Sequence, residues 1–176
     1  RILPLTTKGI AKGGGVYGAG IFDKKAVSEN KDSLLAIGTN MWNKSPLIHG
    51  ETDCIREFFE LPEESRPRTK DTYFFTSHEP CPMCLSAITW GGFDIFYIFW
   101  SYEDSETLFD EPYSRRINEA VWGAQDGNYA HENRFWKAKY VVKMVEALEE
   151  GEVKSALQAQ VARIKDTYAE LWKKYK

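Results

Sequence analysis

Two short motifs, separated by one predicted strand, constrain this chain more than any other feature. The first reads His-Gly-Glu at residues 49–51, and the second reads Pro-Cys-Pro-Met-Cys at residues 80–84. Apolar residues recur at helical spacing after each motif, so each motif is predicted to begin a helix. His49, Cys81 and Cys84 are nitrogen and sulfur donors of the kind that bind zinc, and three such donors leave the fourth tetrahedral position open. The fold must therefore bring two helix starts together around one Zn²⁺ ion.

Glu51 follows His49 by two residues, which is too far round a helix to make both side chains ligands of one ion. A carboxylate placed beside such an ion suits proton transfer, because zinc lowers the pKa of bound water to about 7 and a general base must then take the proton. Hydrolysis of a C–NH2 group needs both steps. The alternative is a structural zinc with His78 as a fourth ligand, which leaves Glu51 without a role. Cys54 is predicted to be a core thiol.

The pattern of apolar and turn residues predicts alternating strands and helices. A weak helix is expected in the first 12 residues, and residues 24–33 are expected to form a polar turn that joins two antiparallel strands. A buried central parallel strand is expected near residues 93–100. The predicted strands are 16–22, 34–38, 72–76, 93–100 and 139–146, and the predicted helices are 49–61, one opening at Pro80, 115–121 and 153–171.

The length of 176 residues and the 43% hydrophobic content predict a single domain spanning residues 1–176. Its core is expected over about 16–100, followed by a cover segment, a last strand and a C-terminal helix in 101–176. The stretch 101–133 has little periodicity and is too long for a simple connection, so it is predicted to be a functional cover. The many aromatic residues fit a core, a ligand pocket or a subunit interface equally well.

The formal net charge of −3 argues against a surface that binds nucleic acid, because such binding needs clustered Lys and Arg facing phosphates. We also find no apolar run near the ~20 residues of a membrane span and no signal peptide, so a cytoplasmic protein without membrane partners is expected. Three Cys make an odd number, which favours metal or core roles over disulfides.

Together, H-x-E at 49–51 and P-C-x-x-C at 80–84 form the signature of the zinc-dependent deaminases. Over residues 16–100 the chain resembles the cytidine deaminase superfamily. The resemblance implies an α/β fold of three layers, α-β-α, with a five-stranded mixed sheet. It also implies Zn²⁺ held by His49, Cys81 and Cys84, with Glu51 as the catalytic residue, and a homodimer in which a neighbour's aromatic side chain often completes the pocket.

Three segments resemble the purine branch of this superfamily. Residues 79–88 resemble guanine deaminases and tRNA adenosine deaminases, and residues 101–110 resemble the corresponding segment of guanine deaminases. Residues 38–40 resemble the G-x-N strand end of the family, although Asn40 would equally suit a turn. The resemblance implies substrate contacts from Asn40, Glu79, Pro80 and Asp110. In the cover segment, Phe109, Tyr113, Trp122 or Tyr129 could stack on a flat ring, or could equally pack the loop onto the domain or bury a dimer interface.

The resemblance thus implies hydrolysis of the exocyclic amine of a free purine base, guanine preferred, or of a nucleoside, with water as co-substrate. Three alternatives remain: deamination of adenosine in tRNA, deamination of cytosine or cytidine, and a catalytically silent binding protein stabilised by zinc. The intact Glu51 counts against the last. The first strand, at residues 16–20, departs from the family pattern, and the last 70 or so residues match no family segment.

Overall fold

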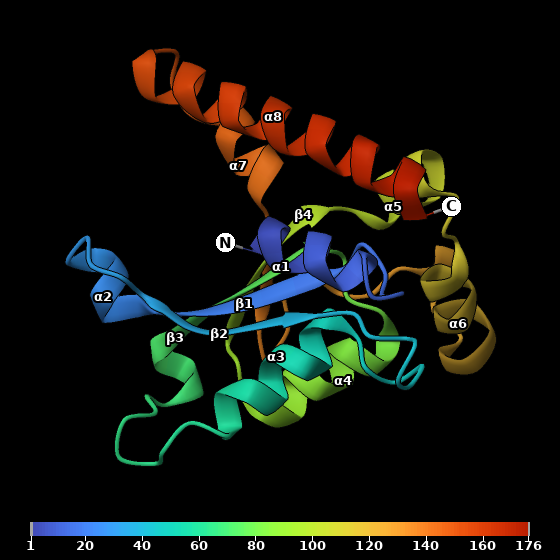
Figure 1. Ribbon diagram of the computed structural model, residues 1–176, viewed down its shortest axis with the longest axis horizontal. Helices are drawn as coiled ribbons and strands as arrows, with labels where there is room; N and C mark the ends of the chain where they lie inside the picture. Colours follow the sequence, from blue (N-terminus) through green and yellow to red (C-terminus); the bar gives the residue numbers. More distant parts are fainter. Residues whose placement is uncertain (1, 176) are drawn as a thin grey trace.

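A five-stranded mixed sheet forms the centre of the molecule, and the computed structural model describes it within residues 2–175 (Figure 1). The strand order is β2-β1-β3-β4-β5. β1 runs antiparallel to both of its neighbours, whereas β3, β4 and β5 are parallel. The strands are β1 (Gly18–Asp23), β2 (Leu34–Thr39), β3 (Thr72–His78), β4 (Ile95–Trp100) and β5 (Lys137–Tyr140).

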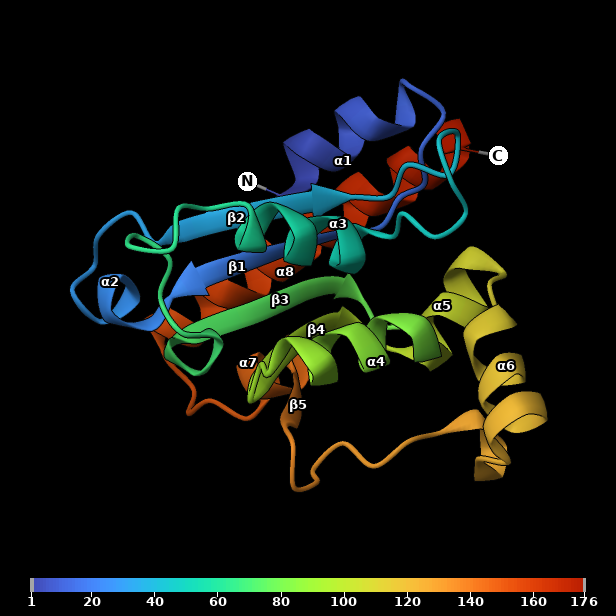
Figure 2. The same ribbon diagram turned by 90° about the horizontal axis from the view of Figure 1, so that it is seen from below.

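Helices cover both faces of this sheet and one of its ends (Figures 1 and 2). One face carries α3 (Gly50–Phe59) and α4 (Pro82–Gly91), and the other carries α1 (Ile2–Ile10), α7 (Val141–Glu146) and α8 (Glu152–Tyr175). α5 (Tyr102–Phe109) and α6 (Tyr113–Trp122) follow β4 at the end where β3 also finishes. The expected three-layer α-β-α architecture with a five-stranded mixed sheet is therefore confirmed.

Two apolar clusters hold the three layers together. Side chains of α3 and α4, among them Phe58 and Ile88, pack on Phe74 and Phe96 of the sheet, and all four are fully buried. A second cluster joins the other face to the C-terminal helix through residues such as Trp100, Phe109 and Tyr168. Each fully buried side chain of this size contributes about 1.5–3 kcal/mol. Both metal-motif helices are thus anchored to the sheet independently of any metal.

Glycine allows α3 to lie directly against the sheet. A Cβ atom on Gly50 would come within 2.7 Å of the Cα of Gly18 in β1, and one on Gly38 in β2 would overlap the backbone of Cys54. Because Gly50 and Gly18 bring the backbones of α3 and β1 together, a larger residue at position 50 would push the helix off the sheet. That turn carries the motif at 49–51.

Four features differ from the sequence-based expectations. The polar turn at 24–33 contains a short helix, α2 (Lys24–Ser28), which Asp23 caps by accepting from the amide of Ala26 at 2.7 Å. The helix expected to open at Pro80 begins at Pro82, after Cys81 as its N-cap. The cover segment contains α5 as well as α6, and the strand expected at 139–146 ends at Tyr140, where α7 begins. Among the described residues, no helix is both long and apolar enough to cross a bilayer.

Candidate active site

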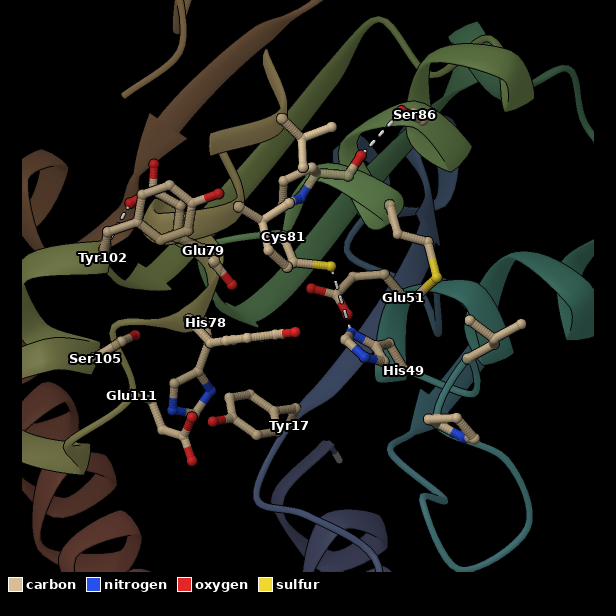
Figure 3. A pocket seen from close by; sticks show the side chains of 18 of the residues that line it. Tyr17, His49, Glu51, His78, Glu79, Cys81, Ser86, Tyr102, Ser105 and Glu111 are labelled. Carbon is tan, nitrogen blue, oxygen red and sulfur yellow. Dashed lines mark hydrogen bonds between the residues drawn. The ribbon is translucent and has the colours of Figure 1, made fainter. Parts of the chain in front are cut away.

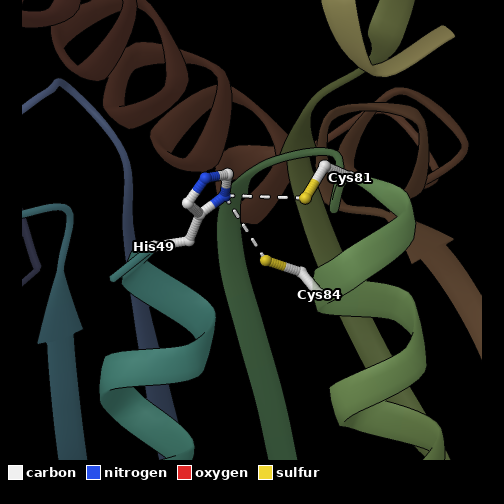
Figure 4. A group of neighbouring side chains, drawn as sticks. All are labelled: His49, Cys81 and Cys84. Atoms are coloured by element: carbon white, nitrogen blue, oxygen red, sulfur yellow. Dashed lines mark hydrogen bonds between the residues drawn. The ribbon is translucent and has the colours of Figure 1, made fainter. Parts of the chain in front are cut away.

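His49, Cys81 and Cys84 converge at the adjacent ends of α3 and α4 (Figure 4). His49 is the N-cap of α3, and its amide donates to Thr52 Oγ1 at 3.0 Å, which fixes the first turn. Cys81 is the N-cap of α4, with Pro82 at the first helical position, where its missing N–H leaves no unpaired donor. Cys84 lies one turn further along the same helix.

The three side chains fit a tetrahedral zinc ion. His49 Nδ1 lies 3.5 Å from Cys81 Sγ and 3.6 Å from Cys84 Sγ. Ordinary Zn–N and Zn–S bond lengths place such donors about 3.6 Å apart on a tetrahedron, which agrees with both of these distances. Among the described residues, the group holds only these three donors, and His78 is not part of it. The structural alternative with four protein ligands is therefore not supported.

The pKa values of the two thiols shift in opposite directions. A hydrogen bond from Cys84, followed by interactions with His49 that oppose the effect of burial, lowers the pKa of Cys81 well below its ordinary value. The same contact between the thiols, together with burial and the charge of Glu51, raises the pKa of Cys84. Burial alone would lower the pKa of His49, but its hydrogen bond with Cys81 and the nearby negative charges raise it. Metal binding therefore competes with protons at these donors.

Glu51 is buried in the first turn of α3, directly beside the three donors. Its Oε1 accepts a hydrogen bond from Thr76 Oγ1 at 2.9 Å, and its Oε2 lies 3.4 Å from Cys84 Sγ. Burial, and then the charge of Cys81, raise the pKa of this carboxyl above its ordinary value. A carboxyl with a raised pKa, fixed by one hydrogen bond, is suited to accept and return a proton near neutral pH.

A cavity of about 580 Å³ opens beside these residues (Figure 3). Aromatic side chains form much of its wall, and three carboxylates, those of Glu51, Glu79 and Glu111, reach it. Within the part of the chain that the structure describes, no Lys or Arg lines it. The cavity thus suits a flat, uncharged molecule with hydrogen-bond donors and is unfavourable for phosphate.

Three of the substrate residues expected from the sequence have their polar groups engaged by the protein. Asn40 is fully buried behind the cavity wall, where its Oδ1 accepts from the amides of Gly15 at 3.0 Å and Trp42 at 3.3 Å, and its Nδ2 has no partner. Glu79 lines the cavity, but Tyr102 N donates to its Oε2 at 2.7 Å and Tyr140 Oη to its Oε1 at 2.8 Å. The carbonyl of Pro80 accepts from Tyr102 Oη at 2.6 Å, and Pro80 is not among the lining residues.

The structure corrects the expected position of Asp110. This residue is the C-cap of α5 with a φ of 54°, and its side chain is exposed outside the cavity. The left-handed turn at Asp110 directs the next residue, Glu111, to the cavity wall instead. Of the four aromatic residues expected to stack on a ring, Tyr113 and Trp122 line the cavity, whereas Phe109 and Tyr129 do not.

Sequence reasoning missed several residues of the wall. Tyr17 falls in a predicted strand and Trp42 lies between a strand and the first motif, but neither was expected at the site, and they line the cavity with ring centroids 5.7 Å apart. His78 was considered only as a metal ligand, yet it also lines the cavity. Its position at the end of β3, just before the second motif, could have indicated that it lies close to the metal site.

Comparison with known proteins agrees with this geometry. Residues 25–99 match the family described as the cytidine and deoxycytidylate deaminase zinc-binding region. A guanine deaminase of Bacillus subtilis (strain 168) is 29% identical over 116 residues, which cover 64% of this chain and 69% of that protein.

Two solved structures share the fold. Guanine deaminase from Nitrosomonas europaea superposes with a TM-score of 0.57 at 20% identity, covering 99% of this chain and 80% of that one. Guanine deaminase from Bacillus subtilis gives a TM-score of 0.54 at 24% identity, covering 91% and 88%. The chain is thus similar to the cytidine and deoxycytidylate deaminases over their zinc-binding region, it shares the fold of these guanine deaminases, and it brings His49, Cys81 and Cys84 together as a group that could hold zinc.

Proposed function

We propose that this enzyme deaminates a free purine base, with guanine preferred. The observation that carries the proposal is the cavity beside the zinc ligands, which combines aromatic walls with carboxylates and, in the described residues, lacks any Lys or Arg. A base or nucleoside fits such a wall, whereas a nucleotide would bring uncompensated phosphate charge. The sequence relative from Bacillus subtilis is a guanine deaminase, which supports guanine as the first substrate to test.

The hydrogen-bond donors of guanine suit the carboxylates of this cavity better than those of adenine do. Guanine carries ring N–H groups and an amino group, and a carboxylate offers only acceptors to them. Glu111 lines the cavity, whereas Asp110 does not. Glu111 is therefore the carboxylate that would accept hydrogen bonds from the ring N–H groups. Asn40 is fully buried and does not line the cavity, so we assign it no direct contact with the base.

Glu51 performs the proton transfers in the proposed reaction. Zinc held by His49, Cys81 and Cys84 supplies Lewis acidity that makes water nucleophilic at neutral pH. As the water oxygen bonds to the ring carbon, Glu51 takes one of its protons and returns it to the base. The remaining water proton passes, again through Glu51, to the departing amine, and the C–N bond breaks to release ammonia and leave a carbonyl. Thr76 keeps the carboxylate oriented throughout.

The test is ammonia release from guanine, guanosine, adenine, cytosine, cytidine and tRNA, with wild type beside Glu51→Gln. Guanine should give the highest kcat/KM, and Glu51→Gln should keep its zinc while losing activity by on the order of a hundredfold or more. Faster deamination of tRNA or cytidine than of guanine would contradict the substrate proposal. Glu51→Gln activity within a few-fold of wild type would remove Glu51 from the reaction.

We also propose that the enzyme works as a homodimer. Tyr113, Val121 and Trp122 line the cavity from α6, and each is about two-thirds exposed, at 69%, 66% and 66%. Exposed apolar side chains clustered at the mouth of a cavity are typical of an interaction surface. Light scattering should give twice the mass of the chain, and Trp122→Glu should shift the protein toward the monomer.

A further inference from the structure

His78 stands apart from the other polar groups in the cavity wall. Its side chain is 3% exposed, and Nδ1 lies 3.0 Å from Ser77 Oγ, which in turn accepts from the amide of Gly18 at 2.9 Å. Its Nε2 is buried and has no hydrogen-bond partner. Among the described residues, five buried side-chain polar atoms lack a partner, and His78 Nε2 is the one that belongs to a cavity-lining residue.

The imidazole of His78 is held in one orientation as a neutral ring. Tyr17, Phe109 and Tyr168 surround it, with ring centroids at 4.6, 5.0 and 5.4 Å. Burial among these rings lowers the pKa of His78 to about 3. At neutral pH the ring therefore presents one uncharged hydrogen-bonding nitrogen beyond the contact to Ser77, and this nitrogen suits a heteroaromatic ring better than an anion.

A series of aromatic rings connects His49 to His78. Starting at His49, the wall continues through Trp42, whose ring centroid is 6.1 Å away, and then through Tyr17, at 5.7 Å from Trp42. His78 follows, 4.6 Å beyond Tyr17. Figure 3 shows His78 gathered with Tyr17 and Glu111, away from His49. A bicyclic base whose amine points at Glu51 would extend along these rings toward His78.

We propose that His78 is a specificity-determining residue whose Nε2 hydrogen-bonds a ring nitrogen of the five-membered ring of the purine. The inference rests on the proposed function, because it takes the six-membered ring to face Glu51. The bond gives His78 Nε2 a hydrogen-bond partner when substrate enters. It also gives the cavity a reason to prefer a fused bicyclic base, because a pyrimidine has no five-membered ring to offer such a nitrogen.

Replacing His78 with Gln or with Asn distinguishes a hydrogen bond to substrate from a role in packing alone. The side-chain amide of Gln reaches the position of imidazole Nε2, whereas that of Asn reaches only the position of Nδ1. His78→Asn should therefore lower kcat/KM for guanine by about tenfold, mainly through KM, while His78→Gln should stay within a few-fold of wild type. Thr6→Val is the matched control, because Thr6 Oγ1 is also buried and unpartnered but does not line the cavity.

Substrate analogues test the bond itself. Wild type should discriminate against 7-deazaguanine or 9-deazaguanine by about tenfold relative to guanine, and His78→Asn should abolish the discrimination against one of them. Calorimetric binding of xanthine, the product of guanine, should weaken by a similar factor in His78→Asn at unchanged zinc content. Equal losses for guanine and both analogues in His78→Asn, or equal behaviour of His78→Gln and His78→Asn, would overturn the inference.

Failure of the His78 proposal can be distinguished from failure of the proposed function. If wild type leaves guanine unchanged but deaminates another amine in the panel, the purine assignment is wrong. The His78→Gln and His78→Asn comparison then runs on that amine. Restoration by Gln but not by Asn keeps His78 as a substrate-contacting residue, and equal rates for the two variants remove it.

Discussion

At the scale of single residues, the three cysteines of this chain have different environments and should behave differently. Cys81→Ala and Cys84→Ala each remove one of three zinc donors, and two protein ligands hold zinc far more weakly than three, so both variants should lose the metal. Cys54→Ala is the control, because Cys54 is buried in the core cluster outside the donor group. Elemental analysis should find about one zinc per chain in wild type and Cys54→Ala. Zinc retained by Cys84→Ala would contradict the ligand assignment.

The buried imidazole of His78 also predicts how stability changes with pH. Its pKa is about 3 in the folded chain and near 6.5 when unfolded, so between these values the unfolded chain binds a proton that the folded chain does not. The free energy of unfolding should therefore decrease as pH falls below 6.5, with His78 contributing about 1.4 kcal/mol per pH unit. Urea unfolding at pH 7, 6 and 5 should show a shallower dependence in His78→Gln. Both proteins keep the same metal ligands, and identical slopes would contradict the burial argument.

At the scale of elements, a buried amide on α6 connects this helix to the turn that follows it and to α5. Asn118 is 4% exposed, and its Nδ2 donates to the carbonyl of Gly127 at 2.9 Å and lies 3.4 Å from Tyr102 Oη. Asn118→Ala should lower the free energy of unfolding by about 1–3 kcal/mol, because it leaves a buried carbonyl unpaired. It should also raise KM, since α6 forms one wall of the cavity. Glu119→Ala, on the exposed side of the same helix, should change neither quantity measurably.

The elements that the sequence predicted well are those with strong apolar periodicity. The strands at β1 to β4, the helix after each motif and α8 all lie where the pattern placed them, within a few residues. α5 was missed because one of its three buried positions is the polar Ser105, although Ser101 and Asp104 form a capping box that marks its start. Residues 141–146 read as a strand because of their valines, but burial of Val145 against the second face of the sheet favours the helix α7.

At the scale of the whole molecule, local motifs were sufficient to predict the zinc donors but not the cavity. His49, Cys81 and Cys84 follow from spacing, because each stands at a helix start. The cavity wall combines side chains from loops, from the end of β3 and from α6, which only the assembled fold brings together. Asp110 illustrates the limit, because a single left-handed residue decides whether it or Glu111 faces inward, and sequence spacing does not encode that rotation.

The carboxylates of the cavity have a consequence for the end of the reaction. Ammonia released there takes up a proton at neutral pH and becomes a cation. The carboxylates of Glu51, Glu79 and Glu111 attract this cation, and among the described residues no Lys or Arg lines the cavity to weaken the attraction. Added ammonium chloride should therefore slow turnover more than potassium chloride does at the same ionic strength, and Glu111→Gln should relieve that inhibition. Initial rates across a salt series would measure the effect, and identical curves for the two salts would contradict it. The charge that makes the cavity unfavourable for phosphate is thus expected also to slow escape of the leaving group.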